Sequence, residues 1–526
     1  MRTAIIGGGI AGLAAAYELD LARRAGADVE YTLFEAGDRL GGSLASEVFE
    51  GAVLERGPDS FLTEKPAAAE LCRELGLGAE LVPSNDAARK TWIVVNNRLV
   101  ALPDGLMFLV PTKLVPTALT RLFSIPTKIR MGLELLHPPR RNSTGDESVA
   151  ALVKRHFGKE AVDRLADPLL SGIYGGDASQ LSARTVLPKL VEMETEYGSL
   201  TRGMLAAHKQ MRERAKAAAH KNGTNPAAGN GRPAPRSIFT SLRGGMQQFV
   251  DALTARLEPA SIRLSTPVSG LAQAMGGWMV QSGTVQSGTV QSGTVELGTV
   301  ELGTVELGTV DSRKAANAGG EPEFYDAVIL ASPAWAAGVL LRPIDRELGD
   351  DLAGIPYSSS ITVNLIYDEA KIGPLPDGFG FLVPGTEARA MLACTFVHRK
   401  FLGRTPPGKA VLRAFLGGAK NEDLLTEPDA VLIATVRREL SEILGSRVLG
   451  AHIEPEHVQV SRWRRAMAQY SVGHQESMKR ITDRLAALPG LRLAGNAYEG
   501  IGIPDCIRLG RRAAKELVGQ LVASSS

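Results

Sequence analysis

The pattern of apolar positions at the start of the chain predicts a strand, a helix and a second strand. Ala4, Ile5 and Ile6 form a short apolar run, a glycine turn follows, and an alanine-rich stretch from Ala11 to Ala25 has the composition and length of a helix. A second strand-like run extends from Val29 to Phe34. This order is that of the βαβ unit that opens a Rossmann-type domain.

Two more runs have the continuous apolar character of buried parallel strands, Asp326–Ala331 and Leu491–Gly495. We expect both to join the first sheet, which makes that domain discontinuous. The excursions between these pieces, about 86–237 and 341–481, mix helical patterns with strand-like runs such as Ser360–Ile366. We expect these excursions to supply the rest of the functional site.

The segment Gln281–Val310 consists of six copies of a five-residue unit, first Gln-Ser-Gly-Thr-Val and then Glu-Leu-Gly-Thr-Val. An odd period sends successive valines to opposite faces of a strand, so the repeats cannot maintain one apolar face. The flanking runs, Gly277–Val280 and Phe324–Val328, look like the two strands of a hairpin. We interpret the repeats as a low-complexity insertion at the tip of that hairpin, with a binding role as the weaker alternative.

Two other segments have contrasting patterns. Residues 205–237 are rich in Ala, Lys, Asn, Gly and Pro without apolar periodicity, which predicts a disordered loop. The segment Leu102–Leu136 has recurring apolar residues between proline turns and predicts helices of a third, mostly helical subdomain. Because its basic residues are scattered and no aromatic belt accompanies them, we expect these helices mainly to cover a core, with a weak peripheral membrane contact as the alternative.

Length and charge narrow the classes of function. The 526 residues are too many for a single core, and a net charge of +2 gives no electrostatic basis for binding nucleic acid. The three cysteines, Cys72, Cys394 and Cys506, are far apart, so we expect neither disulfides nor a metal site. We find no signal peptide and no transmembrane segment and expect a cytoplasmic protein.

The turn after the first strand has the pattern G-x-G-x-x-G. In such turns the first glycine (Gly7) permits the tight bend, the second (Gly9) lets a pyrophosphate approach the backbone, and the third (Gly12) lets helix and strand pack closely. Glu35 ends the second strand 23 positions after Gly12, where a carboxylate accepts ribose hydroxyls. An adenine dinucleotide is therefore expected on the residues of the turn, Gly7, Gly8, Gly9, Ile10, Ala11 and Gly12, and on Glu35.

The next segment decides which dinucleotide is expected. Ala36–Gly42 resembles the second glycine signature of the glutathione-reductase-like flavoproteins, which bind FAD rather than NAD. Arg39 is expected to approach a phosphate as a charged donor, while Gly41 and Gly42 let backbone amides reach it.

Two later glycine turns are expected at the flavin ring, Glu55–Ser60 and the strand–turn–helix segment Ala494–Ile507. In the second, a helix that begins at Pro504 or Asp505 would favour the negative charge of a reduced flavin.

Five motifs resemble one family along nearly the whole chain, the protoporphyrinogen and coproporphyrinogen oxidases of haem biosynthesis. The first two resemble most closely its soluble, coproporphyrinogen-oxidising branch. The motifs are "ERGPDSFL" at 55–62, "PLLSGIYGGD" at 168–177, "SLRGGMQ" at 241–247, "YSVGH" at 470–474 and "YEGIGIPDCI" at 498–507.

The resemblance implies that FAD oxidises a porphyrinogen. Ile173 in the second motif, and the cations Lys65, Arg89 and Lys90, are candidates for contact with the substrate and its propionates. Hydride removal needs a held geometry more than a strong base, so we nominate no general base and interpret His474 as structural. The FAD contacts that the resemblance implies are Gly7 to Gly12, Glu35, Ala36, Ser43, Gly57, Pro58, Asp59, Ser60, Val268, Trp463, Ile501, Gly502 and Ile503.

The expected reaction is oxidation of coproporphyrinogen III to coproporphyrin III with molecular oxygen as acceptor, before hand-off of the product to a later enzyme of the haem pathway. Protoporphyrinogen IX is the near alternative as substrate. Remoter alternatives are an amine oxidase or desaturase, and a flavoprotein that binds porphyrin without catalysis.

The expected fold is α/β. It combines a discontinuous, glutathione-reductase-like Rossmann domain for FAD with a mixed α+β substrate domain and a helical subdomain. The FAD-binding domain is expected at 1–85, 238–340 and 482–526, the substrate domain at 86–104, 181–237 and 341–481, and the helical subdomain at 105–180.

Overall fold

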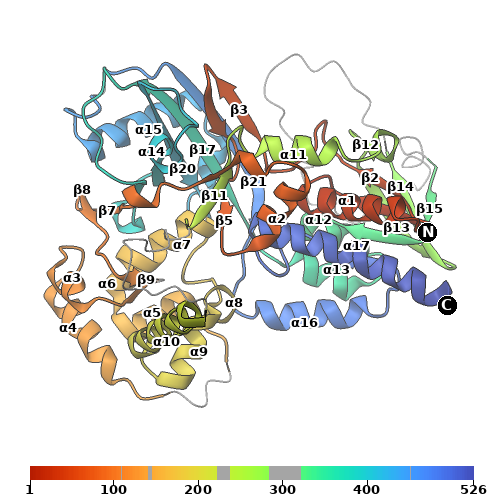
Figure 1. Ribbon diagram of the computed structural model, residues 1–526, viewed down its shortest axis with the longest axis horizontal. Helices are drawn as coiled ribbons and strands as arrows, with labels where there is room; N and C mark the ends of the chain where they lie inside the picture. Colours follow the sequence, from red (N-terminus) through yellow and green to blue (C-terminus); the bar gives the residue numbers. More distant parts are fainter. Residues whose placement is uncertain (108, 140–144, 222–236, 284–320, 451, 526) are drawn as a thin grey trace, which may run out of the picture.

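The computed structural model describes residues 1–107, 109–139, 145–221, 237–283, 321–450 and 452–525. Its buried apolar side chains form three large clusters, around a five-stranded sheet, around a seven-stranded sheet and within a layer of helices. In Figure 1 the five-stranded part lies on the right with both termini, the seven-stranded sheet at the upper left, and the helical layer at the lower left.

The five-stranded sheet is parallel throughout, as its continuous apolar strands predict. The predicted strands of the βαβ unit and the two distant strands all belong to it, so the discontinuity is confirmed. Its order is β12 (Ile262–Arg263), β2 (Glu30–Phe34), β1 (Arg2–Ile6), β16 (Ala327–Leu330) and β22 (Leu491–Leu493).

Two helices from opposite ends of the chain pack side by side on this sheet, α1 (Ile10–Arg24) and α17 (Ile503–Ser525) (Figure 1). A Cβ at Gly510 of α17 would overlap the carbonyl oxygen of Ala11, so glycine is what allows this close approach. The last helix is thereby fixed against the helix that follows the first glycine turn.

The predicted hairpin around the repeats is present. The strand β14 (Gly277–Ser282) pairs antiparallel with β13 (Val268–Ala274) on one side and with β15 (Glu323–Tyr325) on the other. The first repeat supplies the last two residues of β14, Gln281 and Ser282, while the repeats from residue 284 onward lie outside the described residues.

Removing the five repeats from Gln286 to Val310 is expected to leave FAD content and turnover unchanged. The first copy then still completes β14, and shortening a flexible connection changes closure entropy by only about 0.6 kcal/mol per halving of its length. Flavin absorbance of the purified variant measures this.

A matched deletion that begins at Gln281 removes two pairs from the β13–β14 ladder, including Val268 with Ser282. It should lower the unfolding temperature relative to the shorter deletion. Equal flavin loss in both variants would mean that the repeats themselves support the cofactor.

The seven-stranded sheet is mixed and draws on two separate stretches of the chain. One pair of neighbours, β18 and β7, is parallel, and the others are antiparallel. A helix, α15 (Asp429–Leu444), contributes to its core. The order is β21 (His457–Ala468), β17 (Tyr357–Asp368), β20 (Lys409–Gly417), β19 (Met391–Phe396), β18 (Gly380–Leu382), β7 (Thr91–Val95) and β8 (Arg98–Ala101).

The segment 102–136 is only partly as predicted. It begins with a small hairpin, β9 (Leu106–Met107) and β10 (Val110–Pro111), before the expected helices α3 (Leu114–Leu119) and α4 (Ile125–Leu133) and the turn η3 (Glu134–Leu136). The expected core role holds for Leu122, Phe123 and Met131 and is wrong for six side chains that are 57% to 78% exposed: Val115, Leu119, Ile125, Ile129, Leu133 and Leu136.

The helical period explains why some apolar side chains of α4 are exposed and others are buried. Ile125, Ile129 and Leu133 are spaced four residues apart on α4 and share one face, while Met131 lies on the opposite, buried side. Apolar side chains lie on both faces of α4, so the sequence pattern alone did not distinguish the covered face from the exposed one.

The predicted loop 205–237 is wrong in its first half, because the helix α10 (Leu200–Lys221) includes residues 205–221. Ala, Lys, Arg, Glu, Gln and Met favour helices even without an apolar stripe. Leu200 and Met204 are buried and fix the start of α10 in the helical core. Residues 222–236 lie outside the described residues.

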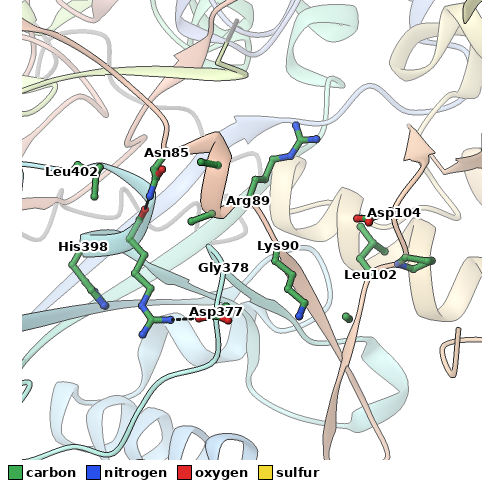
Figure 2. A pocket seen from close by; sticks show the side chains of 14 residues that line it. Asn85, Arg89, Lys90, Leu102, Asp104, Asp377, Gly378, His398 and Leu402 are labelled. Carbon is green, nitrogen blue, oxygen red and sulfur yellow. Dashed lines mark hydrogen bonds and ion pairs between the residues drawn. The ribbon is translucent and has the colours of Figure 1, made fainter. Parts of the chain in front are cut away.

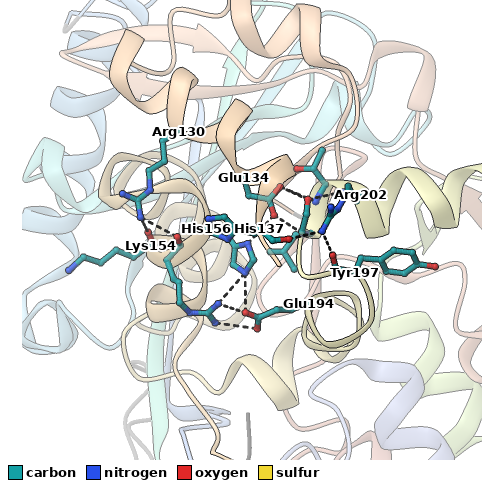
Figure 3. Close-up of polar contacts among 12 residues, drawn as sticks. Arg130, Glu134, His137, Lys154, His156, Glu194, Tyr197 and Arg202 are labelled. Atoms are coloured by element: carbon teal, nitrogen blue, oxygen red, sulfur yellow. Dashed lines mark hydrogen bonds and ion pairs between the residues drawn. The ribbon is translucent and has the colours of Figure 1, made fainter. Parts of the chain in front are cut away.

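A buried polar network ties the ends of several helices together (Figure 3). His156, in α5 (Val149–Phe157), lies between Glu134, 2.9 Å from Nδ1, and Glu194 of α9 (Pro188–Tyr197), 3.3 Å from Nε2. Glu134 also accepts the backbone N–H of Leu200 at the start of α10, and Arg155 bonds Glu194. Although burial lowers it, these two carboxylates raise the pKa of His156 above its ordinary value.

Stability of the helical layer is therefore expected to fall as pH rises above neutral. The raised pKa of His156 means that its contribution is fully present below pH about 6.5, the unfolded value, and is lost as pH rises through the folded value. Each tenfold gain in proton affinity on folding corresponds to about 1.4 kcal/mol of that contribution. Urea unfolding of wild type and His156→Gln between pH 6 and 9 measures the difference. An identical pH slope in both proteins would contradict it.

Candidate active site

The first glycine turn has the geometry that a bound pyrophosphate requires. Gly7 (φ +112°) donates to Phe34 O at 2.8 Å, and a Cβ at Gly12 would overlap Gly7 O. A Cβ at Gly9 would meet nothing within 4 Å. The glycines at 7 and 12 are thus needed by the fold itself, whereas Gly9 borders open space at the start of α1.

Glu35 and the second glycine segment close around this turn. The carboxylate of Glu35 accepts Gly8 N at 2.7 Å and Gly37 N at 2.8 Å, and Gly41 N donates to Gly8 O at 2.8 Å. A carboxylate has about four acceptor positions, so Glu35 keeps capacity for ribose hydroxyls.

Arg39 organises its own loop, since Nη1 donates to Leu40 O and Leu44 O at 3.1 Å and Nη2 bonds Gly42 O. Some of its donors are used in this way, and contact with a phosphate stays a prediction.

The third glycine turn lies directly against the second. A Cβ at Gly57 would overlap Ser43 O, and Arg56 N donates to Ala45 O at 2.8 Å. Trp463 of β21, in the seven-stranded sheet, fixes the same turn, with Nε1 2.7 Å from Arg56 O. The structure thus brings the predicted residues Ser43, Gly57 and Trp463 together.

Two cations hold this turn, Arg413 of β20 and Lys400 at the end of the helix α14 (Val397–Lys400). Arg413 bonds Gly57 O, and the Nζ of Lys400 lies 2.8 Å from Asp59. Burial opposes ionisation, but Lys400 and Arg413 outweigh it and hold the pKa of Asp59 far below its ordinary value. Sequence analysis missed both cations, although a lone arginine inside the apolar run Ala410–Leu416 signals a buried partner.

A fully buried ion pair supports the same segment. The guanidinium of Arg404 bonds Glu55, and both side chains are at most 2% exposed. Arg404 also donates to Ser241 Oγ at 2.8 Å, and Glu55 accepts Met246 N at 2.9 Å. Sequence analysis missed Arg404, which lies in a loop with no motif.

The C-terminal glycine turn, here called the 494–502 loop, precedes α17 and contains the predicted Ile501 and Gly502, with Ile503 as the first residue of the helix. Asp505 in the first turn of α17 accepts Lys65 Nζ at 2.6 Å. Lys65 is 41% exposed, so any substrate carboxylate there would share it with Asp505. Its predicted role in substrate binding stays a prediction.

Tyr174, at the end of α7 (Asp167–Tyr174), faces the same region. Burial first and then the carboxylate of Asp505 raise the pKa of Tyr174, the last residue of α7. Its neighbour Ile173, the predicted substrate contact, is 58% exposed. Sequence analysis included Tyr174 in a motif without assigning it a role.

The predicted cations Arg89 and Lys90 lie elsewhere, in a cavity of about 760 Å³ between the segment 85–90 and α14 (Val397–Lys400). Figure 2 shows the two side chains extending in different directions, and the Nζ of Lys90 lies 4.2 Å from the centre of the Trp92 ring. The structure does not join them to the glycine turns, and a role in propionate binding stays a prediction.

Val268, at the start of β13, follows a short segment that caps the Glu35 end of the sheet. Ser265 N donates to Gly37 O and Thr266 N to Glu35 O, each at 2.8 Å. Val268 is therefore held beside the second glycine segment. His474, interpreted as structural, is buried and stacks on Tyr470 with ring centres 4.4 Å apart.

A family model described as flavin-containing amine oxidoreductase matches residues 10–518. The chain belongs to the flavin-containing amine oxidoreductase family. Its cofactor is FAD, in agreement with the glycine turns and Glu35.

Individual relatives cover the whole chain. It is 31% identical to coproporphyrinogen III oxidase of Bacillus subtilis over 98% of both chains, and 27% identical to chloroplastic protoporphyrinogen oxidase of Nicotiana tabacum over 98% of this chain and 85% of that one. A crystal structure from Exiguobacterium sp. 255-15, named for protoporphyrinogen oxidase, is 30% identical with a TM-score of 0.77 over 99% of both chains.

The residues of this family member fit FAD. The helix α1 begins directly after Gly9, which provides no side-chain cap, so its first N–H groups are left for a pyrophosphate. The buried Oγ of Ser332, beside Gly7 and two residues after β16, has no hydrogen-bond partner among the described residues and offers the cofactor a further polar contact.

Proposed function

We propose that this flavoenzyme oxidises coproporphyrinogen III to coproporphyrin III in three two-electron steps, with molecular oxygen reduced to hydrogen peroxide in each. The observation that carries the proposal is the full-length similarity to coproporphyrinogen III oxidases. The match with the Bacillus subtilis relative covers 98% of both chains. The plant protoporphyrinogen oxidase is less similar and extends beyond the matched part.

The residues of this chain divide the work. When bound, FAD would supply the hydride acceptor and the route by which electrons reach oxygen. The turn at 57–60, held by Arg413 and Lys400, and the 494–502 loop would hold the flavin ring. Lys65 and Asp505 form the charged group at the start of α17, where a substrate carboxylate pairs with Lys65. Since geometry rather than a strong base drives hydride removal, the proposal needs no general base.

The near alternative, protoporphyrinogen IX, differs by carrying vinyl groups in place of two propionates. Turnover of both purified porphyrinogens by the same enzyme preparation tests the proposal. We expect faster oxidation of coproporphyrinogen III. Equal or greater activity on protoporphyrinogen IX would overturn the preference.

Anaerobic mixing separates an oxidase from a flavoprotein that only binds porphyrin. Coproporphyrinogen III is expected to bleach the flavin absorbance, and a simple amine is not. Bleaching by the amine alone would favour the amine-oxidase alternative, and bleaching by neither would favour the binding protein.

We further propose a cytoplasmic enzyme that makes weak peripheral contact with a membrane before its product passes to a later enzyme of the haem pathway. The exposed apolar face of α3 and α4 supports the contact. Between Gly105 and Pro139 the only acidic residue is the buried Glu134, whereas Lys113, Arg121, Lys128 and Arg130 are basic. None of the helices in the described ranges is long and apolar enough to cross a membrane.

Partial cosedimentation with anionic liposomes at low salt is expected, and most protein should stay in the supernatant at moderate salt because surface charge attraction is screened. The double variant Ile125→Ser/Ile129→Ser removes two exposed apolar side chains and should abolish the low-salt pellet. Pelleting that is unchanged in this variant would contradict a contact through α4.

A further inference from the structure

The hydroxyl of Tyr470 is bonded to two backbone groups of the 494–502 loop. It donates to Asn496 O at 2.8 Å and accepts Gly500 N at 2.7 Å, and the side chain is 3% exposed. Gly500 has a φ of +132°, a conformation that other residues rarely adopt, so its N–H has a fixed direction. Both bonds act across 26 to 30 residues of sequence and define the shape of this loop.

The main chain around Tyr470 is bonded to a different part of the molecule. Ser182 N donates to Tyr470 O at 2.7 Å, and Val472 N donates to Gln180 O at 3.0 Å. Gly473 N donates to Asp146 Oδ2 at 3.1 Å. Residues 470–473, here called the strap, therefore connect the helical layer to the 494–502 loop.

The strap also reaches the end of α7. Its neighbour Gln469 donates from Nε2 to Tyr174 O at 2.7 Å and to Ser358 Oγ at 2.9 Å. On the other side, His474 stacks on the Tyr470 ring and bonds the backbone of Tyr498 within the loop. The loop is thus held by the strap at Asn496 and Gly500, and by the next residue, His474, at Tyr498.

We propose that Tyr470 is a positioning residue that sets the geometry of the 494–502 loop at the flavin and couples it to the helical layer through the strap. The loop leads directly into the first turn of α17, where Asp505 pairs with Lys65. A displacement of α7 or of residues 180–182 is transmitted through hydrogen bonds of 2.7 to 3.0 Å to the loop. The proposal rests on FAD binding and not on which porphyrinogen is oxidised.

The variant Tyr470→Phe keeps the ring and its stacking on His474 but removes both hydroxyl bonds. Hydrogen–deuterium exchange of the purified protein, with and without FAD, is expected to be about tenfold faster for amides 496–502, as the loss of buried hydrogen bonds predicts. The visible flavin absorption bands and the flavin midpoint potential of the holoenzyme are expected to shift. These measurements involve no porphyrinogen, so their outcome does not depend on whether the proposed substrate is correct.

Tyr367→Phe is the matched control, because Tyr367 is 1% exposed in β17 and lies in the core of the seven-stranded sheet. It should leave exchange in 496–502 and the flavin spectrum unchanged. Wild-type exchange in Tyr470→Phe, or an equal spectral shift in both variants, would overturn the positioning role.

Asp146→Ala tests the coupling separately, since it removes the acceptor for Gly473 N without touching the loop. Faster exchange is expected in 470–474 and also in 496–502. An increase confined to 470–474 would overturn the coupling.

Discussion

Gly9→Ala is expected to abolish FAD binding while the apoprotein stays folded. The backbone of Gly9, with φ −68° and ψ 178°, is one that alanine adopts without strain, and its Cβ would meet no protein atom within 4 Å. That Cβ would instead occupy the space through which a pyrophosphate approaches the start of α1. Flavin absorbance and a flavin-binding titration are expected to show at least about a hundredfold weaker binding, with near-wild-type circular dichroism.

Gly12→Ala is the matched comparison within the same turn. Here the added Cβ overlaps the carbonyl oxygen of Gly7, so the change is expected to lower the unfolding temperature of the apoprotein as well as flavin content. Gly9→Ala with full flavin content would contradict the assignment of the pyrophosphate to this turn.

Arg404→Met is expected to lower the free energy of unfolding by about 3–5 kcal/mol, since it leaves the carboxylate of Glu55 buried without its cation. The turn at 55–60 should loosen with it, because Arg404 also bonds Ser241. Urea unfolding and flavin content of the same preparations measure both effects.

The control is Arg342→Met, whose partner Asp350 lies 2.9 Å away in a pair that is 59% and 48% exposed. An exposed pair of this kind contributes about 0–1 kcal/mol. The double variant Glu55→Gln/Arg404→Met should recover part of the loss, because it removes the unpaired charge. Equal costs for Arg404→Met and Arg342→Met would mean that the burial of the pair does not determine its contribution.

The parts of the site that were predictable from the sequence depend on contacts between residues that lie close together in the chain. The turn from Gly7 to Gly12 requires glycine for reasons that act within a few residues, and the same holds for the segment after Glu35. The distant strands β16 and β22 were predictable because burial on both faces leaves a continuous apolar run.

The supports of the site were not predictable in this way. Arg404, Arg413 and Lys400 act on residues that lie 341 to 356 positions earlier in the chain, and no period or motif relates such pairs. The start of α10 depends on Glu134, which accepts the N–H of Leu200 from another helix. Helix and strand propensities predicted neither the contacts of the three cations nor the contact of Glu134, because all of them form only when the chain has folded.

The strand order of the five-stranded sheet has a consequence for synthesis on the ribosome. The central strand β1 is made before its neighbour β16, which follows about 300 residues later, and the edge strand β22 follows about 160 residues after β16. During translation the first glycine turn is therefore without Ser332 and without the 494–502 loop until these distant segments have been made. A sheet that closes between such distant segments folds slowly, and a chain released before residue 491 exposes the apolar edge of β16. Newly made chains of this protein are accordingly expected to need protection from aggregation until α17 has packed against α1.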